Sequence, residues 1–247
     1  MRTSWDHTEC QNLRSALSKE WLETNGLGGY ASSSIVGANT RRHHGLLVVA
    51  LDPPGLRHVL LAKLEERVLL NGQECYLSTN LYPGTVFPHG FNIQTGFALN
   101  PWPTFRYEGR GFEIVKSVCL VHGRNIVVVA YHLRQAAAGC TLAVRPLLAF
   151  RDFNKLSRQN AEANLSVEAR GSVYSVQPWQ QLPRLYFHLS PCDADPRPYW
   201  YFRMTYPVDR ERGFDYEEDL FSPLEWRFHL RSGETVYVAV SYTHLRA

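Results

Sequence analysis

The sequence predicts an all-β fold in which two antiparallel sheets pack face to face. Aromatic residues make up 13% of the 247 residues, and aromatic and β-branched side chains are enriched in strands. Segments rich in Val, Leu and Ile recur at intervals of roughly ten residues and are bounded by Gly, Pro or Asn. No helical pattern of crossover length separates them, although a parallel sheet needs such crossovers. We therefore expect a two-sheet sandwich.

The first predicted element is a short N-terminal helix over residues 9–24. Leu13, Ala16, Leu17 and Trp21 recur at helical spacing, and the dipeptide Asn25-Gly26 ends the pattern. Predicted strands then cover residues 45–51, 59–70, 112–121, 126–133 and 141–150.

The last two predicted strands form a hairpin. Trp226, Phe228 and Leu230 alternate with polar side chains, which is the period-two pattern of a strand with one buried face. Ser232-Gly233 then turns the chain into a strand over residues 235–240.

Residues 192–225 interrupt this pattern as one long insertion. The insertion begins with a Pro-rich loop, and residues 209–220 are charged and are expected to be partly helical. Long ordered excursions often bind ligands or form interfaces, and a solvated insertion is the alternative.

An acidic run within the insertion contains Asp215, Glu217, Glu218 and Asp219. Two carboxylates could serve as the acid and base of a glycoside hydrolase, but nothing in the sequence fixes their separation. We expect a solvated charged face instead.

Composition also limits the partners. The net charge of +3 is spread along the chain without Lys or Arg blocks, which argues against nucleic acid and anionic membranes as partners. No run approaches the ~18 apolar residues of a membrane span, and no apolar signal segment opens the chain. Five cysteines without a C-x-x-C pair are typical of reduced thiols. We expect a cytoplasmic protein.

A glycine-rich segment at residues 26–31 matches the pattern G-x-G-x-x-A. In dinucleotide sites this loop follows a buried parallel strand and opens a helix, whereas here a charged segment precedes it and three serines follow. We expect these glycines to provide positive φ angles or a close approach to another segment.

A polar cluster at residues 39–45 contains Asn39, Arg41, Arg42, His43 and His44. Guanidinium and imidazole groups here could line a pocket for carboxylates or sugar hydroxyls, and an ordinary polar loop is the alternative.

Two adjacent pairs in the sequence are expected to diverge. Neighbouring side chains on an extended strand point to opposite faces, so His43 and His44 should not share one metal ion. For the same reason, at most one of Glu65 and Glu66 should line any given site. No other spacing of His or Cys predicts a metal site.

Four aromatic residues near prolines are candidates for stacking against sugar rings: Trp102, Trp179, Tyr199 and Trp200. A flat ring can cover the apolar face of a sugar while its polar atom reaches a hydroxyl group. The alternative for each of them is a place in the core.

Beyond these patterns, residues 20–33 and 39–47 closely resemble the N-terminal domain of bacterial and archaeal-type glycogen debranching enzymes. Further matches follow in order at residues 63–66, 80–84, 88–90, 146–152, 212–215 and 218–220. The resemblance covers roughly residues 18–240.

The resemblance implies an all-β supersandwich that precedes an (α/α) helical barrel. In such enzymes the barrel carries the amylo-α-1,6-glucosidase chemistry, with its acid and base carboxylates. We therefore expect a domain over residues 1–240 without catalytic residues, cofactor or metal, and a non-native or truncated tail over residues 241–247. The catalytic barrel is expected to be absent from this chain.

The partners implied are an α-glucan (glycogen, limit dextrin or maltooligosaccharide) and the C-terminal barrel of the same polypeptide. Glucan-chain transferase activity is also described for the family. The residues predicted to bind substrate or face the barrel are Asn25, Gly28, Tyr30, Asn39, Arg41, Arg42, His43 and His44. The alternative is a stand-alone α-glucan-binding module in which surface aromatics such as Trp179 or Trp200 provide a stacking platform.

Overall fold

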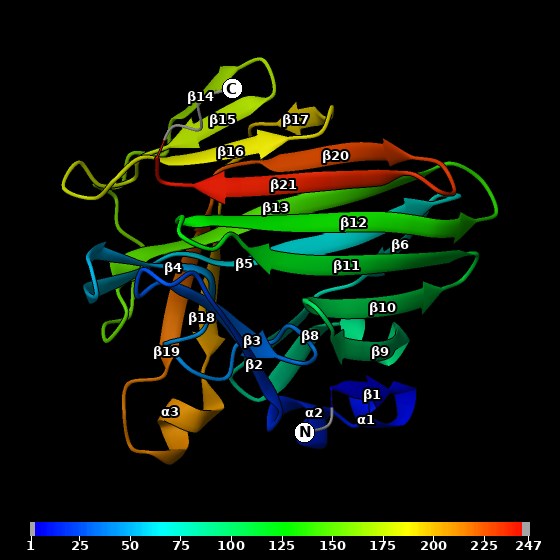
Figure 1. Ribbon diagram of the computed structural model, residues 1–247, viewed down its shortest axis with the longest axis horizontal. Helices are drawn as coiled ribbons and strands as arrows, with labels where there is room; N and C mark the ends of the chain where they lie inside the picture. The colour runs from blue at the N-terminus through cyan, green and yellow to red at the C-terminus, as the bar shows by residue number, and fades with distance from the viewer. Residues whose placement is uncertain (1–2, 244–247) are drawn as a thin grey trace.

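The computed structural model describes residues 3–243 and confirms the antiparallel two-sheet sandwich. Within these residues, nine strands form sheet A, in the spatial order β1 (Ser4–Asp6), β9 (Gln94–Leu99), β10 (Pro103–Gly109), β11 (Phe112–Leu120), β12 (Ile126–Ala136), β21 (Thr235–Ser241), β16 (Leu185–Leu189), β15 (Val173–Val176) and β14 (Val167–Arg170). In Figure 1, β12 and β21 of this sheet lie in front of β13 and β5 of the second sheet.

Sheet B contains ten strands of the described chain. Its main path is β17 (Asp193–Asp195), β20 (Glu225–Leu230), β13 (Cys140–Asp152), β5 (Gly55–Leu70), β4 (Gly45–Asp52), β3 (Tyr30–Ser34) and β2 (Glu20–Thr24). Three further strands branch from it: β19 (Glu217–Ser222) pairs with β13 and with β18 (Tyr199–Thr205), and β6 (Gln73–Tyr76) pairs with β5.

A separate hairpin and short helices complete the described chain. The hairpin consists of β7 (Thr79–Tyr82) and β8 (Thr85–His89), and the helices are α1 (His7–Gln11), α2 (Leu13–Leu17), a 3-10 turn (Gly90–Ile93) and α3 (Pro207–Glu211). No helix in residues 3–243 is long and apolar enough to cross a lipid bilayer.

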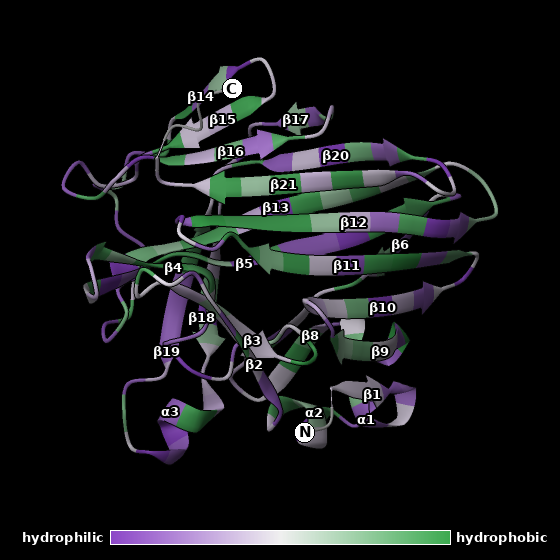
Figure 2. Cartoon of the chain, viewed as in Figure 1, coloured by the Kyte–Doolittle hydropathy of each residue, from purple (hydrophilic) through white to green (hydrophobic). Residues whose placement is uncertain are grey.

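The core lies between the two sheets because strand residues alternate between the two faces. Burial along β11 alternates residue by residue, and Figure 2 shows strongly hydrophobic residues alternating with less hydrophobic ones along β21. Aromatic side chains fill the space between the sheets: the ring centroids of Phe187 and Trp226 lie 5.0 Å apart, and those of Phe97 and Phe105 4.9 Å apart.

One buried ion pair also joins the sheets. The Lys116 ammonium, on β11, donates to the carboxylate of Glu66 on β5, and the Tyr131 hydroxyl donates to the same oxygen. Each of these polar groups has a partner, as burial in an apolar core requires.

The predicted helix over residues 9–24 is wrong in its second half. Residues 20–24 form β2, and only α1 and α2 are helical in this region. Trp21 is buried between the more exposed Glu20 and Leu22, so the segment has the period of a strand. Trp21 fits both periods, and pairing with β3 decides between them.

The insertion is more regular than expected. Residues 199–205 and 217–222 pair as the β18–β19 hairpin, and α3 lies between them. Ser241, where the non-native tail was predicted to begin, is the last residue of β21, and residues 244–247 of that tail lie outside the described residues.

Candidate functional site

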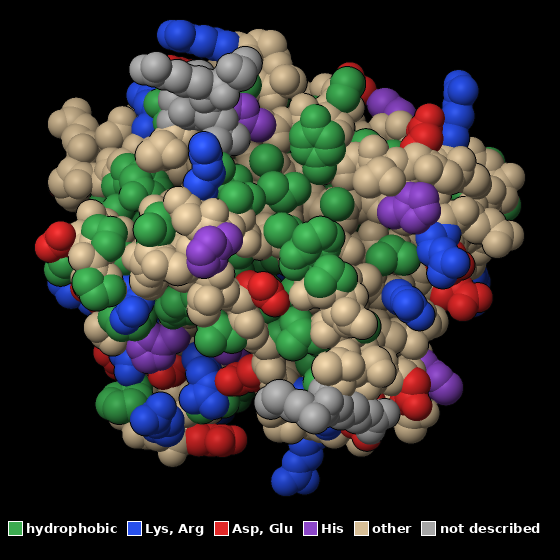
Figure 3. Space-filling model, viewed as in Figure 1, with side chains coloured by type: hydrophobic (Ala, Val, Ile, Leu, Met, Phe, Trp, Pro, Cys, Tyr) green, Lys and Arg blue, Asp and Glu red, His purple; other side chains and the backbone are tan. Residues whose placement is uncertain are grey.

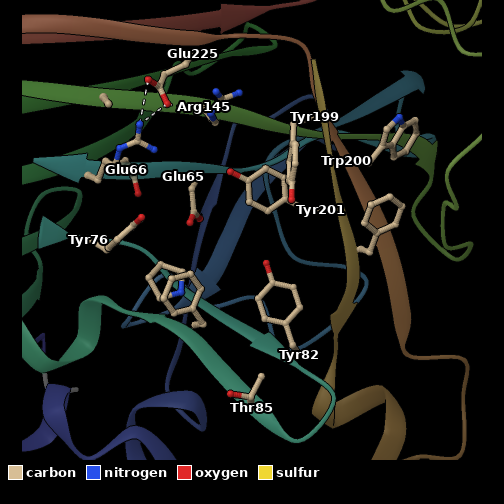
Figure 4. Close-up of a pocket in the computed structure, with 15 residues that line it drawn as sticks. Glu65, Glu66, Tyr76, Tyr82, Thr85, Arg145, Tyr199, Trp200, Tyr201 and Glu225 are labelled. Atoms are coloured by element: carbon tan, nitrogen blue, oxygen red, sulfur yellow. Dashed lines mark hydrogen bonds and ion pairs between the residues drawn. The ribbon is translucent and has the colours of Figure 1, made fainter. Parts of the chain in front are cut away.

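A cleft of about 520 Å³ opens on the outer face of sheet B (Figure 4). Its floor is formed by β5, β13 and β20, and its walls by β6, the β7–β8 hairpin and β18. The side chains that line it combine aromatic rings with charged groups: Glu65, Arg67, Tyr76, Tyr82, Phe87, Arg145, Tyr199, Tyr201, Phe202 and Glu225.

Strand pairing places the charged groups on one face of the sheet. Glu65 on β5 lies opposite Arg145 on β13, and two residues along β5 Arg67 lies opposite Ala143. Their neighbours Leu64 and Val144 are fully buried on the opposite, core side. The period of two therefore brings to the cleft floor side chains that are 80 residues apart in sequence.

At one end of the floor, Glu225 is surrounded by three guanidinium groups. Arg67 and Arg145 each place a nitrogen 3.0 Å from Oε2 of Glu225, and Arg227 Nε lies 2.9 Å from Oε1. Glu225 is 1% exposed, so these ion pairs compensate the burial of its charge. The carboxylate is fixed in place, and two of the three arginines, Arg67 and Arg145, line this end of the cleft.

Glu65 has a different environment near the middle of the cleft. Its Oε2 accepts a hydrogen bond of 2.8 Å from Asn80 Nδ2. Burial raises the pKa of Glu65, although the nearby Lys63 ammonium acts in the opposite direction. The Glu66 carboxylate points the other way, to Lys116 and Tyr131 between the sheets, so the two carboxylates diverge. The expectation that at most one of the pair lines a given site is wrong, because Glu66 also lines the cleft.

Tyrosine rings form most of the aromatic wall. The rings of Tyr199 and Tyr201 lie 5.3 Å apart at an angle of 82°, and Figure 4 shows both beside Tyr82. Burial raises the pKa of Tyr82 and of Tyr201 above its ordinary value, so both hydroxyls stay protonated and can donate hydrogen bonds.

A β-bulge in β18 adds one more ring to this wall. The register shifts between Tyr201 and Met204, so Phe202 and Arg203 together lie opposite Asp219 of β19. Arg203 has a φ of 57°, which is unusual for a residue with a side chain. The bulge interrupts the alternation of the strand, and Phe202 lines the cleft together with Tyr201.

This arrangement suits a ligand with flat apolar faces and many hydroxyl groups. The rings can cover the apolar faces, while Glu65, the tyrosine hydroxyls and Arg145 supply acceptors and donors. In the part of the chain that the structure describes, no group of three or more His, Cys, Asp or Glu side chains could hold a metal ion.

The predicted residues of the glycine-rich loop lie between β2 and β3, outside the cleft. Asn25 is fully buried: its Oδ1 accepts from the N–H groups of Leu27 and Gly29, and its Nδ2 donates to the Arg124 carbonyl and to Asn125. The side chain thus holds the turn together.

Gly28 lies in this loop, and Tyr30 follows it as the first residue of β3. Gly28 has a φ of 85°, and a Cβ atom there would lie 2.9 Å from the carbonyl oxygen of Pro54, so both expectations for the glycine are met. The Tyr30 hydroxyl donates to the His43 carbonyl at 2.6 Å, and burial raises the pKa of Tyr30 to about 12.

The polar cluster at residues 39–45 is a turn that leads directly into β4. Asn39 is buried and donates to the Ala62 carbonyl. Arg41 Nε donates to Glu20 Oε1 at 2.8 Å, and His44 Nε2 lies 3.5 Å from the same oxygen. This part of the cluster is held by internal partners.

Arg42 and His43 extend from the turn to other segments. The Arg42 N–H donates to Asp209 of α3 at 2.6 Å, and the Arg42 guanidinium donates to the Asn154 carbonyl at 2.9 Å. The His43 ring lies 3.2 Å from Asn154 Oδ1 and packs edge-on against Phe153. His43 and His44 diverge as predicted, because of the turn. A substrate or interdomain role for these residues stays a prediction.

The expected solvated face at the acidic run is wrong for two of its members. Glu218 is fully buried in an ion pair with Arg151, whose NH2 donates to Oε2 at 2.8 Å, and the Tyr206 hydroxyl donates to the same carboxylate oxygen. Asp219 is 8% exposed and holds the bulge at Arg203. Their partners are distant in sequence, so the run alone could not reveal their burial.

The predicted stacking aromatics separate into two groups. Tyr199 and Trp200 line the cleft, although the Trp200 ring packs on Phe221 on the other side of β18. Trp102 is exposed elsewhere, and Trp179 packs against the core. Sequence reasoning missed Tyr82, Tyr201, Arg145 and Glu225. The alternation of residues within each strand was the available signal for them. Only the pairing of the strands shows that these four side chains lie in one cleft.

The fold and the cleft define a β-sandwich domain with an aromatic, charge-bearing cleft on one outer face. The sequence matches the family model described as glycogen debranching enzyme N terminal over residues 19–237. The chain belongs to this family. No curated protein matches the sequence.

Three solved structures are similar to this chain over part of their own length. Heparinase III, the BT4657 gene product, is 11% identical with a TM-score of 0.36, over 70% of this chain and 22% of that one. A mutant of the heparan sulfate lyase HepC from Pedobacter heparinus is 10% identical with a TM-score of 0.34, over 82% and 24%. A bacterial glucoamylase in complex with acarbose is 9% identical with a TM-score of 0.37, over 98% and 33%. The matches therefore span at most a third of these longer chains.

Proposed function

We propose that this chain is the glucan-positioning N-terminal domain of a cytoplasmic glycogen debranching enzyme. In this proposal the cleft on sheet B binds an α-glucan segment of glycogen, limit dextrin or a maltooligosaccharide. A C-terminal (α/α) barrel of the same full-length polypeptide hydrolyses the α-1,6 branch points. The observation that carries the proposal is the cleft itself, where Tyr82, Tyr199 and Tyr201 surround Glu65 in a member of this family.

The chemistry of the cleft favours binding over catalysis. A glycoside hydrolase needs a proton donor and a second carboxylate that is free to act as base or nucleophile. Glu225 is held by three arginines, and the Glu66 carboxylate is held by Lys116 and Tyr131. Glu65 is therefore left without a free carboxylate partner in the cleft lining. We expect the purified chain to release no glucose from a branched limit dextrin.

A second surface supports packing against another domain. On the outer face of sheet A, Cys119, Val128 and Ala239 lie side by side across three strands, and Ala130 is paired with the exposed Tyr237. We call these five residues the sheet A band. Figure 3 shows apolar side chains gathered over this face, which in an antiparallel sheet is ordinarily polar when it faces water. The barrel is the partner proposed for it.

Binding is tested by titrating the purified chain with maltoheptaose in a calorimeter. Tyr199→Ala should weaken binding about two- to twelvefold, because an aromatic stacking contact contributes about 0.5–1.5 kcal/mol. Tyr237→Ala is the matched control: Tyr237 is similarly exposed, at 49% against 58%, but lies on sheet A. Absence of glucan binding, or equal losses in the two variants, would contradict the proposal.

The stand-alone glucan-binding module uses the same cleft and is distinguished by the sheet A band. A surface that covers another domain should cause the isolated chain to self-associate, and Tyr237→Lys should reduce that association. A wild-type chain that stays monomeric at high concentration, and still binds maltoheptaose, would favour the stand-alone module.

A further inference from the structure

A second hollow lies on the other side of the β7–β8 hairpin from the cleft. This groove has a volume of about 560 Å³ and lies between α2, the hairpin and α3. Leu13 and Leu17 of α2 form one wall, Val86 and His89 of β8 form another, and Pro207 of α3 lies opposite. We call it the helix groove.

The cleft and the helix groove share a wall. Tyr82 and Thr85 line both hollows, and they pair with each other at the end of the hairpin. Only Pro83 and Gly84 lie between them, both exposed, and Gly84 has open space beside it. Figure 4 shows this turn directly below the cleft, with Tyr82 and Thr85 directed towards it. A flexible ligand can therefore pass from one hollow to the other over a two-residue turn.

The lining of the helix groove fits an uncharged ligand with apolar faces. Among the described residues that line it there is one guanidinium, Arg210, and no carboxylate, and the rest of the surface is mostly aliphatic or aromatic. The Arg210 guanidinium lies 5.4 Å from the centroid of the Tyr216 ring. This cation–π contact partly satisfies the charge of Arg210. Rings such as His89 and Phe91 offer apolar faces to sugar C–H groups, as the tyrosines do in the cleft.

Each hollow alone suits a ligand of a few sugar rings, since small-molecule sites measure roughly 300–1,000 Å³. From this continuity we infer that a single α-glucan chain occupies both hollows, crossing the Tyr82–Thr85 turn, so that the domain selects long linear chains over short ones. The inference rests on the proposed function of the cleft. A glucan chain that contacts both hollows binds more tightly than one that contacts a single hollow, because the second contact is intramolecular.

The test compares maltotriose with a maltodextrin of uniform, long chain length. The wild-type chain should bind the long glucan at least tenfold more tightly than maltotriose. Val86→Asp and His89→Ala change side chains that line the helix groove and do not line the cleft. Both should bring the affinity for the long glucan close to that for maltotriose and leave maltotriose binding unchanged. Because the His89 ring also contacts Phe87 in the cleft, unchanged maltotriose binding is the check that the cleft is intact. His229→Ala is the control, because His229 is exposed on β20 and lines neither hollow.

The outcomes separate this inference from the proposed function. A long chain also gains affinity statistically, because it offers more binding positions, but that gain is the same in wild type and variants. Equal preference for the long glucan in all of them would overturn the inference and leave the cleft proposal intact, with the helix groove covered by protein instead. Failure of the wild type to bind maltotriose and the long glucan would overturn both. His89→Ala keeps the test valid if Val86→Asp does not fold, because the His89 side chain is exposed.

Discussion

The carboxylate of Asp219 accepts a hydrogen bond of 2.9 Å from the backbone N–H of Arg203, across the bulge in β18. Its second oxygen accepts a hydrogen bond of 3.0 Å from the N–H of Gln159. One side chain of β19 therefore satisfies two backbone donors and fixes the strand segment that presents Tyr201 and Phe202 to the cleft. A buried acceptor in this position acts on both stability and binding.

Asp219→Asn should lower the free energy of unfolding by about 1–3 kcal/mol, because an amide nitrogen then faces one of the two N–H donors. It should also weaken maltoheptaose binding, since the bulge loses its support. Urea unfolding and calorimetry measure the two effects. Asp215→Asn, in the same acidic run but exposed, is the control and should change neither quantity. Unchanged stability in Asp219→Asn would show that the bulge is held by other contacts.

The sandwich could be predicted from the sequence because its evidence is local. Alternation along residues 226–231 and apolar runs such as residues 141–150 mark strands wherever they pair, and the family resemblance covers nearly the whole chain. The region around Trp21 could not be assigned in this way. Its spacing from Leu17 fits a helix, and pairing of β2 with β3 is a property of the fold rather than of the segment.

The cleft could not be predicted, since no short segment contains it. Arg145 and Glu225 are 80 residues apart and Arg67 and Glu225 are 158 apart, and only the order of β5, β13 and β20 in sheet B brings them together. Glu65 was visible as a charged residue within a strand, and Tyr199 as a stacking candidate. The bulge at Arg203 and the position of the hairpin that bears Tyr82 could not be predicted, because both depend on how the strands pair.

Glu218 provides the strongest stability prediction, because its ion pair with Arg151 is almost completely buried. Glu218→Gln leaves the Arg151 charge without its partner and should cost about 3–5 kcal/mol of unfolding free energy. Glu217→Gln is the matched control, because Glu217 pairs with Arg203 at an exposed position and should change stability little. Equal effects in urea unfolding would mean that burial does not strengthen the Glu218 pair.

Glu20 should make the stability depend on acid pH. Partial burial alone would raise its pKa, but hydrogen bonds from His44 and Arg41 lower the pKa from 4.5 to about 2. A carboxyl whose pKa is lower in the folded state stabilises the fold above pH 4.5, and this contribution is lost as the pH falls towards 2. The stability difference between wild type and Glu20→Gln should therefore shrink over this range in urea titrations.

Glu23 on the same strand is the control for this pH dependence. Burial raises the pKa of Glu23, so its ionisation opposes folding and the sign is reversed. Glu23→Gln should gain stability relative to wild type at neutral pH, and the gain should disappear as the pH falls. The same sign for the two variants would contradict the assignment of the Glu20 effect to His44 and Arg41.

Gly28 combines two features that each favour glycine, a positive φ angle and a close neighbouring backbone atom. Gly28 and Gly171 both have positive φ angles, 85° and 59°, but a Cβ atom at Gly28 would lie 2.9 Å from the Pro54 carbonyl, whereas Gly171 has open space. Gly171→Ala should cost about 1 kcal/mol, from the left-handed backbone alone. Gly28→Ala should cost about 2 kcal/mol or more, because backbone must also shift where Arg57 donates to the Gly28 carbonyl at 2.8 Å. Thermal unfolding of the two variants measures the difference, and equal losses would assign the role of Gly28 to its φ angle alone.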